Sequence, residues 1–99
     1  MSKYEVEFTF EASNDYDKLD GSAKLHVMKS VAKLEKIGME AGEALHGKLS
    51  DCRKLKHRKL GIRVVFKENE HSIEIIEIIV IGKREKAEVY LEVEKRLRR

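Results

Sequence analysis

Hydrophobic and polar positions alternate with two different periods along the chain, and these periods predict its secondary structure. Residues 3–10 alternate with a period of two, so that Tyr4, Val6, Phe8 and Phe10 point to one side. This pattern is typical of a β-strand with one buried face. The sequence therefore predicts a half-buried first strand.

Two helices are predicted after this strand. The first is short and acidic, and its N-cap is expected within residues 13–15, which are Ser, Asn and Asp. The second begins with Ser22 as N-cap and continues to about Ile37, where Gly38 ends it. Its apolar positions recur with the period of a helix. They are Val27, Val31 and Leu34, with Leu25 and Met28 beside them.

The second half of the chain predicts three strands and a closing helix, after a loop at 39–51. They follow in the order Cys52–His57, 62–67, a polar turn at 68–71, 72–81 and a helix from about 85 to 97. The resulting order, β-α-α-β-β-β-α, predicts an α+β fold. We expect a small antiparallel-rich sheet of about four strands, packed by two N-terminal helices, with a C-terminal helix. The sheet face that carries the lysines is expected to stay partly open.

Composition and length are those of one small folded domain, at residues 1–99. The chain is 11.5 kDa, 41% hydrophobic and 39% charged, with one cysteine. The apolar share excludes a disordered chain, and a single cysteine excludes a disulfide scaffold. No apolar stretch is long enough for a membrane span, and the N-terminus lacks the pattern of a signal peptide. The expected location is cytoplasmic.

The positive charge is concentrated in one block. Residues 52–67 hold seven cations and no acid, whereas the other residues hold 14 cations and 18 acids. Such a patch favours a polyanion such as a nucleic acid. A protein partner with acidic segments and a solvated strand face with acids nearby in space are the alternatives.

Lys54 and Lys56 stand two positions apart on a predicted strand, so they share a face about 7 Å apart. Arg63 on the next strand can lie beside them. A cluster of cations attracts phosphate and disfavours a further proton on a lysine, which suits a general base. An exposed lysine-rich strand that deters edge pairing is the alternative.

A second candidate group lies where the most apolar strand meets the last helix. Gly82 ends the strand, and Lys83 and Arg84 precede a helix N-terminus, which favours an anion. The arginine suits a phosphoryl group. Tyr90 can stack a base or hold a ribose or phosphate oxygen, or it can be a half-buried core residue.

The remaining reactive residues predict no cofactor. The four histidines and Cys52 lack the spacing of metal ligands, and the cysteine is expected to be a small buried hydrophobic residue. His57 lies in the basic block and is a candidate to touch a substrate.

These motifs together resemble the RelE branch of the RelE/ParE toxin superfamily. A K-x-K strand at 54–56, a G-x-R strand at 61–63 and a G-K-R-E helix entry followed by Tyr90 occur in that order. The resemblance covers about residues 49–98, and the N-terminal half matches in its β-α-α order. It implies the toxin half of a bacterial type II toxin–antitoxin pair.

By resemblance, five residues form the catalytic set. Lys54 is expected to act as base, Lys56 and Arg63 to stabilise the phosphorane, Arg84 to act as acid or charge clamp, and Tyr90 to orient the base or ribose. Many relatives carry another arginine where this chain has residues 45–47, and a contact to RNA is expected to pass to His46. The expected RNA-binding residues are Arg53, His57, Arg58, Lys59, Lys83 and His46.

The implied activity is ribosome-dependent cleavage of mRNA in the A site, by attack of the RNA 2′-OH and without a metal. The implied partners are the ribosome with its mRNA and an acidic RelB-like antitoxin, with operator DNA bound only through the antitoxin complex. The free toxin is expected to be a monomer. Two alternatives stay open: a non-enzymatic toxin of the gyrase-inhibitor type, and an inactive relative that binds only an antitoxin or DNA.

Overall fold

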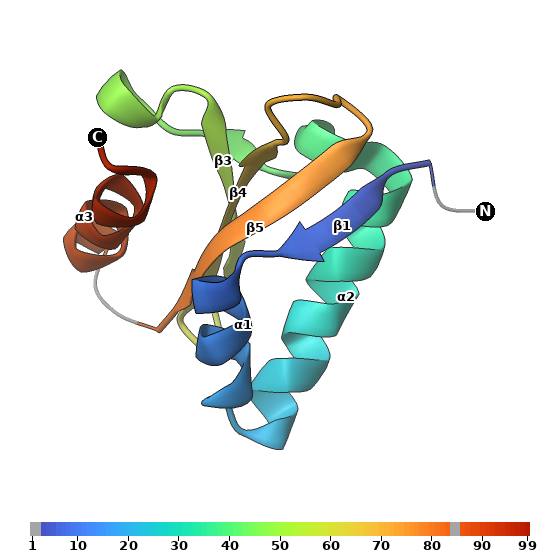
Figure 1. Cartoon of the computed structure of the whole chain (residues 1–99). Helices are drawn as coiled ribbons and strands as arrows, with labels where there is room; N and C mark the ends of the chain where they lie inside the picture. The colour runs from blue at the N-terminus through green and yellow to red at the C-terminus, as the bar shows by residue number, and fades with distance from the viewer. Residues whose placement is uncertain (1–2, 84–85) are drawn as a thin grey trace.

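A computed structural model describes residues 3–83 and 86–99 of the chain. Its described elements are two short 3-10 helices, five strands and three α-helices (Figure 1). In chain order they are β1 (Glu5–Phe8), α1 (Phe10–Asp17), α2 (Gly21–Ile37), η1 (Gly38–Ala41), β2 (Glu43–Ala44), η2 (Gly47–Leu49), β3 (Cys52–His57), β4 (Ile62–Glu68), β5 (Ile75–Gly82) and α3 (Lys86–Leu97). The predicted α+β fold is confirmed, with five strands in place of about four.

The strands form one mixed sheet in the order β1-β5-β4-β3-β2. Strands β3, β4 and β5 form the predicted antiparallel meander, and β1 joins the far side of β5 in parallel. The additional strand is β2, in which Glu43 and Ala44 pair with Lys54 and Arg53. This pair of residues lies within the segment predicted as a loop, because two residues are too few to show an alternating pattern.

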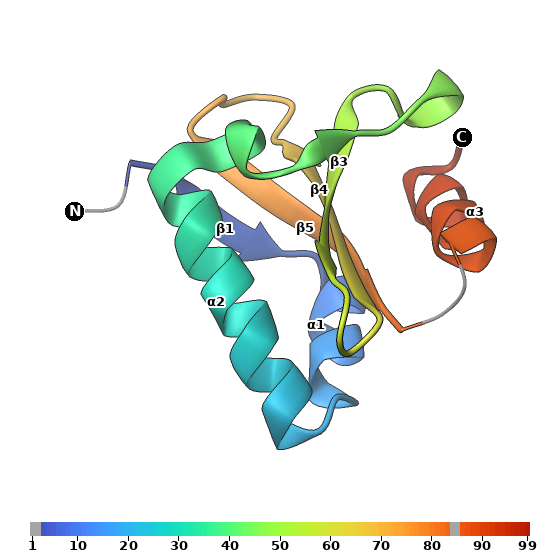
Figure 2. The same ribbon diagram turned by 180° about the vertical axis from the view of Figure 1, so that it is seen from behind.

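Helices cover both faces of the sheet. Figure 1 shows α1 and α2 against one face and α3 against the other, and the reverse view in Figure 2 shows the same three layers. A larger core lies under α1 and α2, where Leu34, Phe66 and Ile76 are fully buried. A smaller core lies under α3 and includes Val89 and Val93. Because α3 is the helix of the lysine face, that face is partly covered by a single helix.

Strand β5 is apolar almost throughout and contains a bulge. Val65 pairs with Val80 and the next residue, Phe66, pairs with Ile78, so Ile79 is an extra residue in the ladder. Because of the extra residue, the adjacent Ile79 and Val80 both belong to the smaller core, whereas Ile78 and Ile81 belong to the larger one. A continuous apolar run therefore belongs to a strand that is buried on both faces.

The start of the chain differs from the prediction in where the first strand ends. Thr9 is the N-cap of α1, and its hydroxyl accepts the N–H of Ala12 at 3.1 Å. The helix therefore begins before the predicted caps at 13–15, and Phe10, expected in the strand, is 81% exposed on the helix. Tyr16 and Leu19 pack against the larger core.

The N-cap of α2 is Asp20 in place of the predicted Ser22. Its carboxylate accepts the N–H of Ala23 at 2.8 Å, and this hydrogen bond holds the pKa of Asp20 below its usual range. The helix ends at Gly38, as predicted. Gly38 has a φ of +58°, and a Cβ there would lie 2.8 Å from the ring of Tyr4, so both backbone and space require glycine.

The turn between β4 and β5 is longer than the predicted four residues. The side chain of Asn69 accepts the N–H of His71 at 2.8 Å, and that of Ser72 accepts the N–H of Glu74 at 3.2 Å. Such local hydrogen bonds favour turns over strands. Strand β5 consequently begins at Ile75, and Ile73 is left 72% exposed. Among the described helices, none combines the length and hydropathy of a membrane span.

Candidate functional site

The structure brings three of the predicted catalytic cations onto the sheet face that α3 covers. In β3, Lys54 and Lys56 alternate with residues of the other face. In the register of the β3–β4 hairpin, Lys56 lies opposite Arg63 and Lys54 opposite Val65. Directly opposed residues have Cβ atoms about 5 Å apart. Lys56 and Arg63 are therefore neighbours, with Lys54 one position further along the same face.

Tyr90 from α3 completes this group. The ammonium of Lys54 donates a hydrogen bond to the phenol oxygen of Tyr90 at 3.0 Å and lies 5.6 Å from the centre of its ring. The lysine is only 8% exposed. Burial of a charge is costly unless the charge has a partner, and here the partner is a neutral phenol and its π-face. Within residues 3–83 and 86–99, no carboxylate lies within ion-pair distance of Lys54.

Lys67 shows the contrast on the same strands. It belongs to the basic block and is 7% exposed, but its ammonium lies 3.6 Å from the carboxylate of Glu77 and donates to the carbonyl of Glu68 at 3.0 Å. A cation that is neutralised in this way stabilises the fold. We therefore exclude Lys67 from the candidate site.

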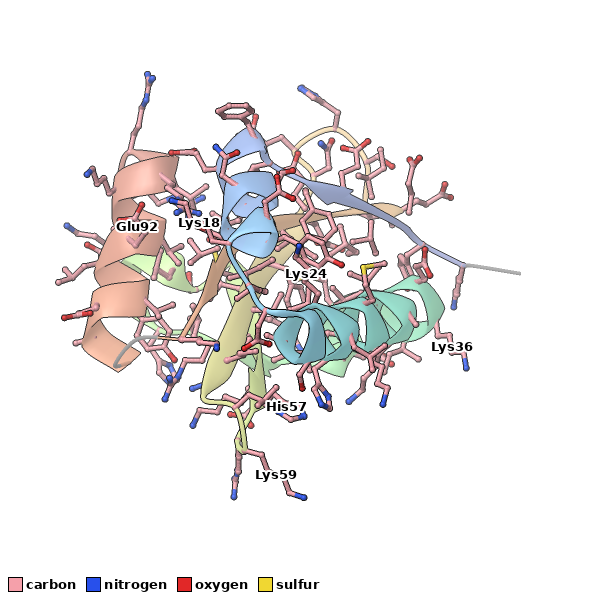
Figure 3. All side chains as sticks on the ribbon, turned by 90° about the horizontal axis from the view of Figure 1, so that it is seen from below. Lys18, Lys24, Lys36, His57, Lys59 and Glu92 are labelled. Carbon is pink, nitrogen blue, oxygen red and sulfur yellow. The ribbon has the colours of Figure 1, made fainter. Side chains whose placement is uncertain are left out.

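Two of the predicted RNA-binding residues lie on the opposite face of β3. Arg53 donates to the carbonyl of Gly42 at 3.3 Å. The ring of His57 packs on that of His26 with centroids 3.9 Å apart, and Figure 3 shows His57 on the side of α2. Burial, and then the charges of His57 and two lysines, lower the pKa of His26. The structure thus separates His57 from Lys54 and Lys56.

The other predicted RNA-binding residues that the structure describes are exposed, in turns and at the ends of elements. Arg58 and Lys59 are exposed in the β3–β4 turn, where Figure 3 shows Lys59 at the tip. His46 is exposed at the start of η2. Lys83 is exposed 3.6 Å from Asp20, and an ion pair this open contributes little and can be exchanged for a phosphate. Arg84, the fifth predicted catalytic residue, lies outside the described residues.

Cys52 is fully buried beside this face, as predicted. Burial, together with the carboxylate of Asp51, raises the pKa of its thiol to about 11. The thiol is therefore protonated at neutral pH and is no nucleophile. Among the described residues no cluster of three or more His, Cys, Asp or Glu side chains is placed to hold a metal.

Sequence reasoning missed the ion pairs that hold α3 in place. Arg96 forms a two-pronged pair with Asp15 of α1, at 2.7 and 3.1 Å, and Arg99 pairs with Asp51. The pairing raises the pKa of both arginines and lowers that of Asp51 to about 2. The sequence does show acids in the first helix and arginines at the end of the last helix, and this pattern could have suggested an ion pair between them.

Comparisons with known proteins show the family of the chain. No family model matches the chain. The chain is 33% identical to the mRNA interferase toxin RelE of Escherichia coli K12, over 95% of its own length and 97% of the relative. A free E. coli RelE with two arginines replaced has a TM-score of 0.78 at 30% identity, covering 98% of this chain and 99% of that one. The same mutant bound to an antitoxin RelBc peptide has a TM-score of 0.71 at 31% identity, covering 91% and 93%. By sequence and by structure, the chain belongs to the RelE family of toxins.

Proposed function

We propose that this protein is the toxin of a toxin–antitoxin pair and cleaves mRNA on the ribosome as an endoribonuclease. The observation that carries the proposal is the convergence of Lys54, Lys56 and Arg63 on one sheet face, with Tyr90 brought onto Lys54 from a distant helix. Its relative in E. coli is named an mRNA interferase, which supports the same chemistry.

The proposed reaction uses the nucleophile that RNA itself carries. Lys54, as the free amine, takes the proton of the 2′-OH, and the 2′-oxygen attacks the adjacent phosphorus. The bond to the 5′-oxygen breaks, leaving a 2′,3′-cyclic phosphate on one fragment. A proton from Arg84 or from water completes the 5′-OH of the other fragment. The negative charge that develops on the phosphorane is stabilised by Lys56 and Arg63.

Tyr90 has two roles in this proposal. Its phenol fixes the position of the Lys54 amine in the free protein, at 3.0 Å. Its ring, which lies beside that amine, is available to orient a nucleobase or ribose. The ribosome supplies the geometry of the mRNA, because holding the 2′-OH in line with the scissile bond removes much of the barrier. The reaction as written needs no metal ion.

The proposed protein partner is an acidic antitoxin, and the location is the cytoplasm, where translating ribosomes are found. RelE relatives have been solved with RelB-type antitoxins. In this chain a groove of about 670 Å³ lies between α1, β5 and α3, and apolar residues such as Leu19 and Leu91 line it together with charged residues of both signs. An amphipathic segment fits such a groove, and the acids of that segment would pair with Lys18 and Lys95.

The experiment is primer extension on mRNA after incubation with translating ribosomes. The protein is expected to cut mRNA at discrete positions, and Lys54→Ala and Arg84→Ala are expected to abolish the cuts. Lys36→Ala is the matched control, because it removes one positive charge from the exposed face of α2, away from the site (Figure 3).

Three results would contradict parts of the proposal. Undiminished cleavage by Lys54→Ala would overturn the assignment of the base. Growth arrest with intact mRNA and blocked DNA supercoiling would favour the gyrase-inhibitor alternative. Expression without any effect on growth would favour a relative that only binds an antitoxin or DNA.

A further inference from the structure

The edge of β5 is left open where β1 ends. The parallel pairing of the two strands covers Glu5–Phe8, opposite Ile75–Ile78, and the chain then turns into α1 at Thr9. Beyond Ile78, β5 has a strand neighbour on its β4 side alone, and the bulge at Ile79 follows at once. Backbone groups on a buried strand require hydrogen-bond partners. The last residues of β5 therefore need partners that do not come from a strand.

Two side chains provide these partners. The carboxylate of Asp15 in α1 accepts the N–H of Ile81 at 3.1 Å, and the guanidinium of Arg96 in α3 donates to the carbonyl of Ile79 at 2.8 Å. The two side chains also bind each other through both prongs of the guanidinium. Figure 1 shows this end of β5 running between α1 and α3.

The pair is well shielded. The side chains of Arg96 and Asp15 are 11% and 18% exposed, and the Nε–H of the guanidinium donates to Glu92 at 2.8 Å. A planar guanidinium held by four hydrogen bonds in fixed directions tolerates little displacement. The pair therefore fixes the place of α3 on the end of β5 as well as its rotation.

Tyr90 is carried by the same helix. Its hydrogen bond to Lys54 joins α3 to β3, and a hydrogen bond of 3.0 Å tolerates a shift of only a few tenths of an ångström. The apolar contacts of Val89 and Val93 under α3 are non-directional and do not specify such a position. The Arg96–Asp15 pair is a directional contact that does, and it is more shielded than the Arg99–Asp51 pair that follows α3.

We propose that Asp15 and Arg96 are positioning residues for the cleavage reaction, acting through α3 to hold the phenol of Tyr90 on the amine of Lys54. This inference rests on the proposed function. It also gives the acidic first helix a role, because its Asp15 carboxylate binds Arg96 and so fixes the position of the helix that carries Tyr90.

The test is a double-mutant cycle between Asp15→Asn and Tyr90→Phe, read as kcat for cleavage of ribosome-bound mRNA. The asparagine keeps the shape but turns an NH2 group toward Arg96 or Ile81. In the Tyr90 background, kcat is expected to fall about tenfold or more, since small misplacements of reacting groups have effects of this size. In the Tyr90→Phe background, Asp15→Asn is expected to change kcat less than about twofold, with KM unchanged in both.

A merely structural role would lower kcat by the same factor in both backgrounds, and that result overturns the proposal. Arg99→Gln is the matched control, because it breaks a more exposed pair at the end of the same helix. It is expected to leave kcat nearly unchanged. Asp15→Glu, which keeps the charge and moves the carboxylate, serves as the second variant if Asp15→Asn does not fold.

A second measurement separates this proposal from the proposed function. The NMR resonance of the ε-carbon of Lys54 reports its contact with the phenol in the free protein, without ribosomes. Asp15→Asn is expected to move this resonance toward its position in Tyr90→Phe. If the wild-type protein does not cleave mRNA but the resonance moves, the function fails and the positioning role holds; an unmoved resonance overturns the positioning role.

Discussion

Replacement of Gly42 by alanine tests how closely β2 packs on the strand that carries the lysines. A Cβ at Gly42 would lie 2.6 Å from the carbonyl oxygen of Lys54 and 2.6 Å from the ring of Phe66. The first atom belongs to the backbone of β3, and the ring is fully buried, so neither can give way. Relief requires β2 to move off β3. Overpacking of this kind costs about 1–3 kcal/mol, and each kcal/mol lowers the Tm of a domain of this size by about 4–8 °C.

The matched control is Gly21→Ala. A Cβ at Gly21 meets nothing within 4 Å, and the residue is the first of α2, where alanine fits the helix. This substitution is expected to leave stability unchanged or to raise it by up to about 1 kcal/mol. Thermal and urea unfolding, followed by circular dichroism, measure both variants. Equal midpoints for Gly42→Ala and Gly21→Ala would refute the close packing of β2.

Three further predictions follow from the titrating groups. The pKa of His26 lies below its ordinary 6.5 because of burial and the neighbouring His57. The unfolded chain therefore binds a proton at this residue more readily than the folded chain does. The free energy of unfolding should therefore fall as the pH drops below about 6.5, and denaturant titrations of His26→Gln should show a flatter profile. The thiol of Cys52, with its pKa raised from 9.0 to about 11, should react with iodoacetamide at least about a hundredfold more slowly in the folded protein than in denaturant, as thiol quantification measures. The pKa of Asp51 is lowered from 3.8 to about 2 by Arg99, so this pair stabilises the protein above about pH 4. The difference in Tm between Asp51→Asn and the wild type should be only a few degrees, because the pair is exposed, and it should shrink below about pH 4 and vanish once the pH falls below about 2.

The elements that could be predicted are those whose burial follows a regular period. The helix at 21–37 has one buried face, so its apolar residues report its structure directly. The strand at 62–68 is buried on both faces, and there the β-branched residues indicate a strand. The end of β1 could not be predicted in this way. The alternation continues to Phe10, but the hydroxyl of Thr9 caps a helix, and this local hydrogen bond outweighs the pattern.

Part of the candidate site could likewise be predicted from the sequence, and part of it could not. That Lys54 and Lys56 share a face follows from the geometry of a strand, and the hairpin brings Arg63 opposite Lys56. The contact of Tyr90 with Lys54 joins residues 36 positions apart, and it forms because α3 packs on the sheet with Tyr90 above β3. No local pattern specifies such a contact, because it depends on which face of a helix meets which face of the sheet.

The partner that each buried or half-buried cation receives indicates what it does. Lys67 and Arg96 each face a carboxylate, and a carboxylate both neutralises the charge and occupies the place where a phosphate would bind. Lys54 is as buried as Lys67, but faces a phenol, which satisfies one hydrogen bond, and no carboxylate of residues 3–83 and 86–99 lies within ion-pair distance of it. Keeping an ammonium this far from water costs stability. Under the proposed function, an incoming RNA phosphate would offset that cost, so the difference between Lys54 and Lys67 on a single sheet face supports the proposal of an RNA site at Lys54.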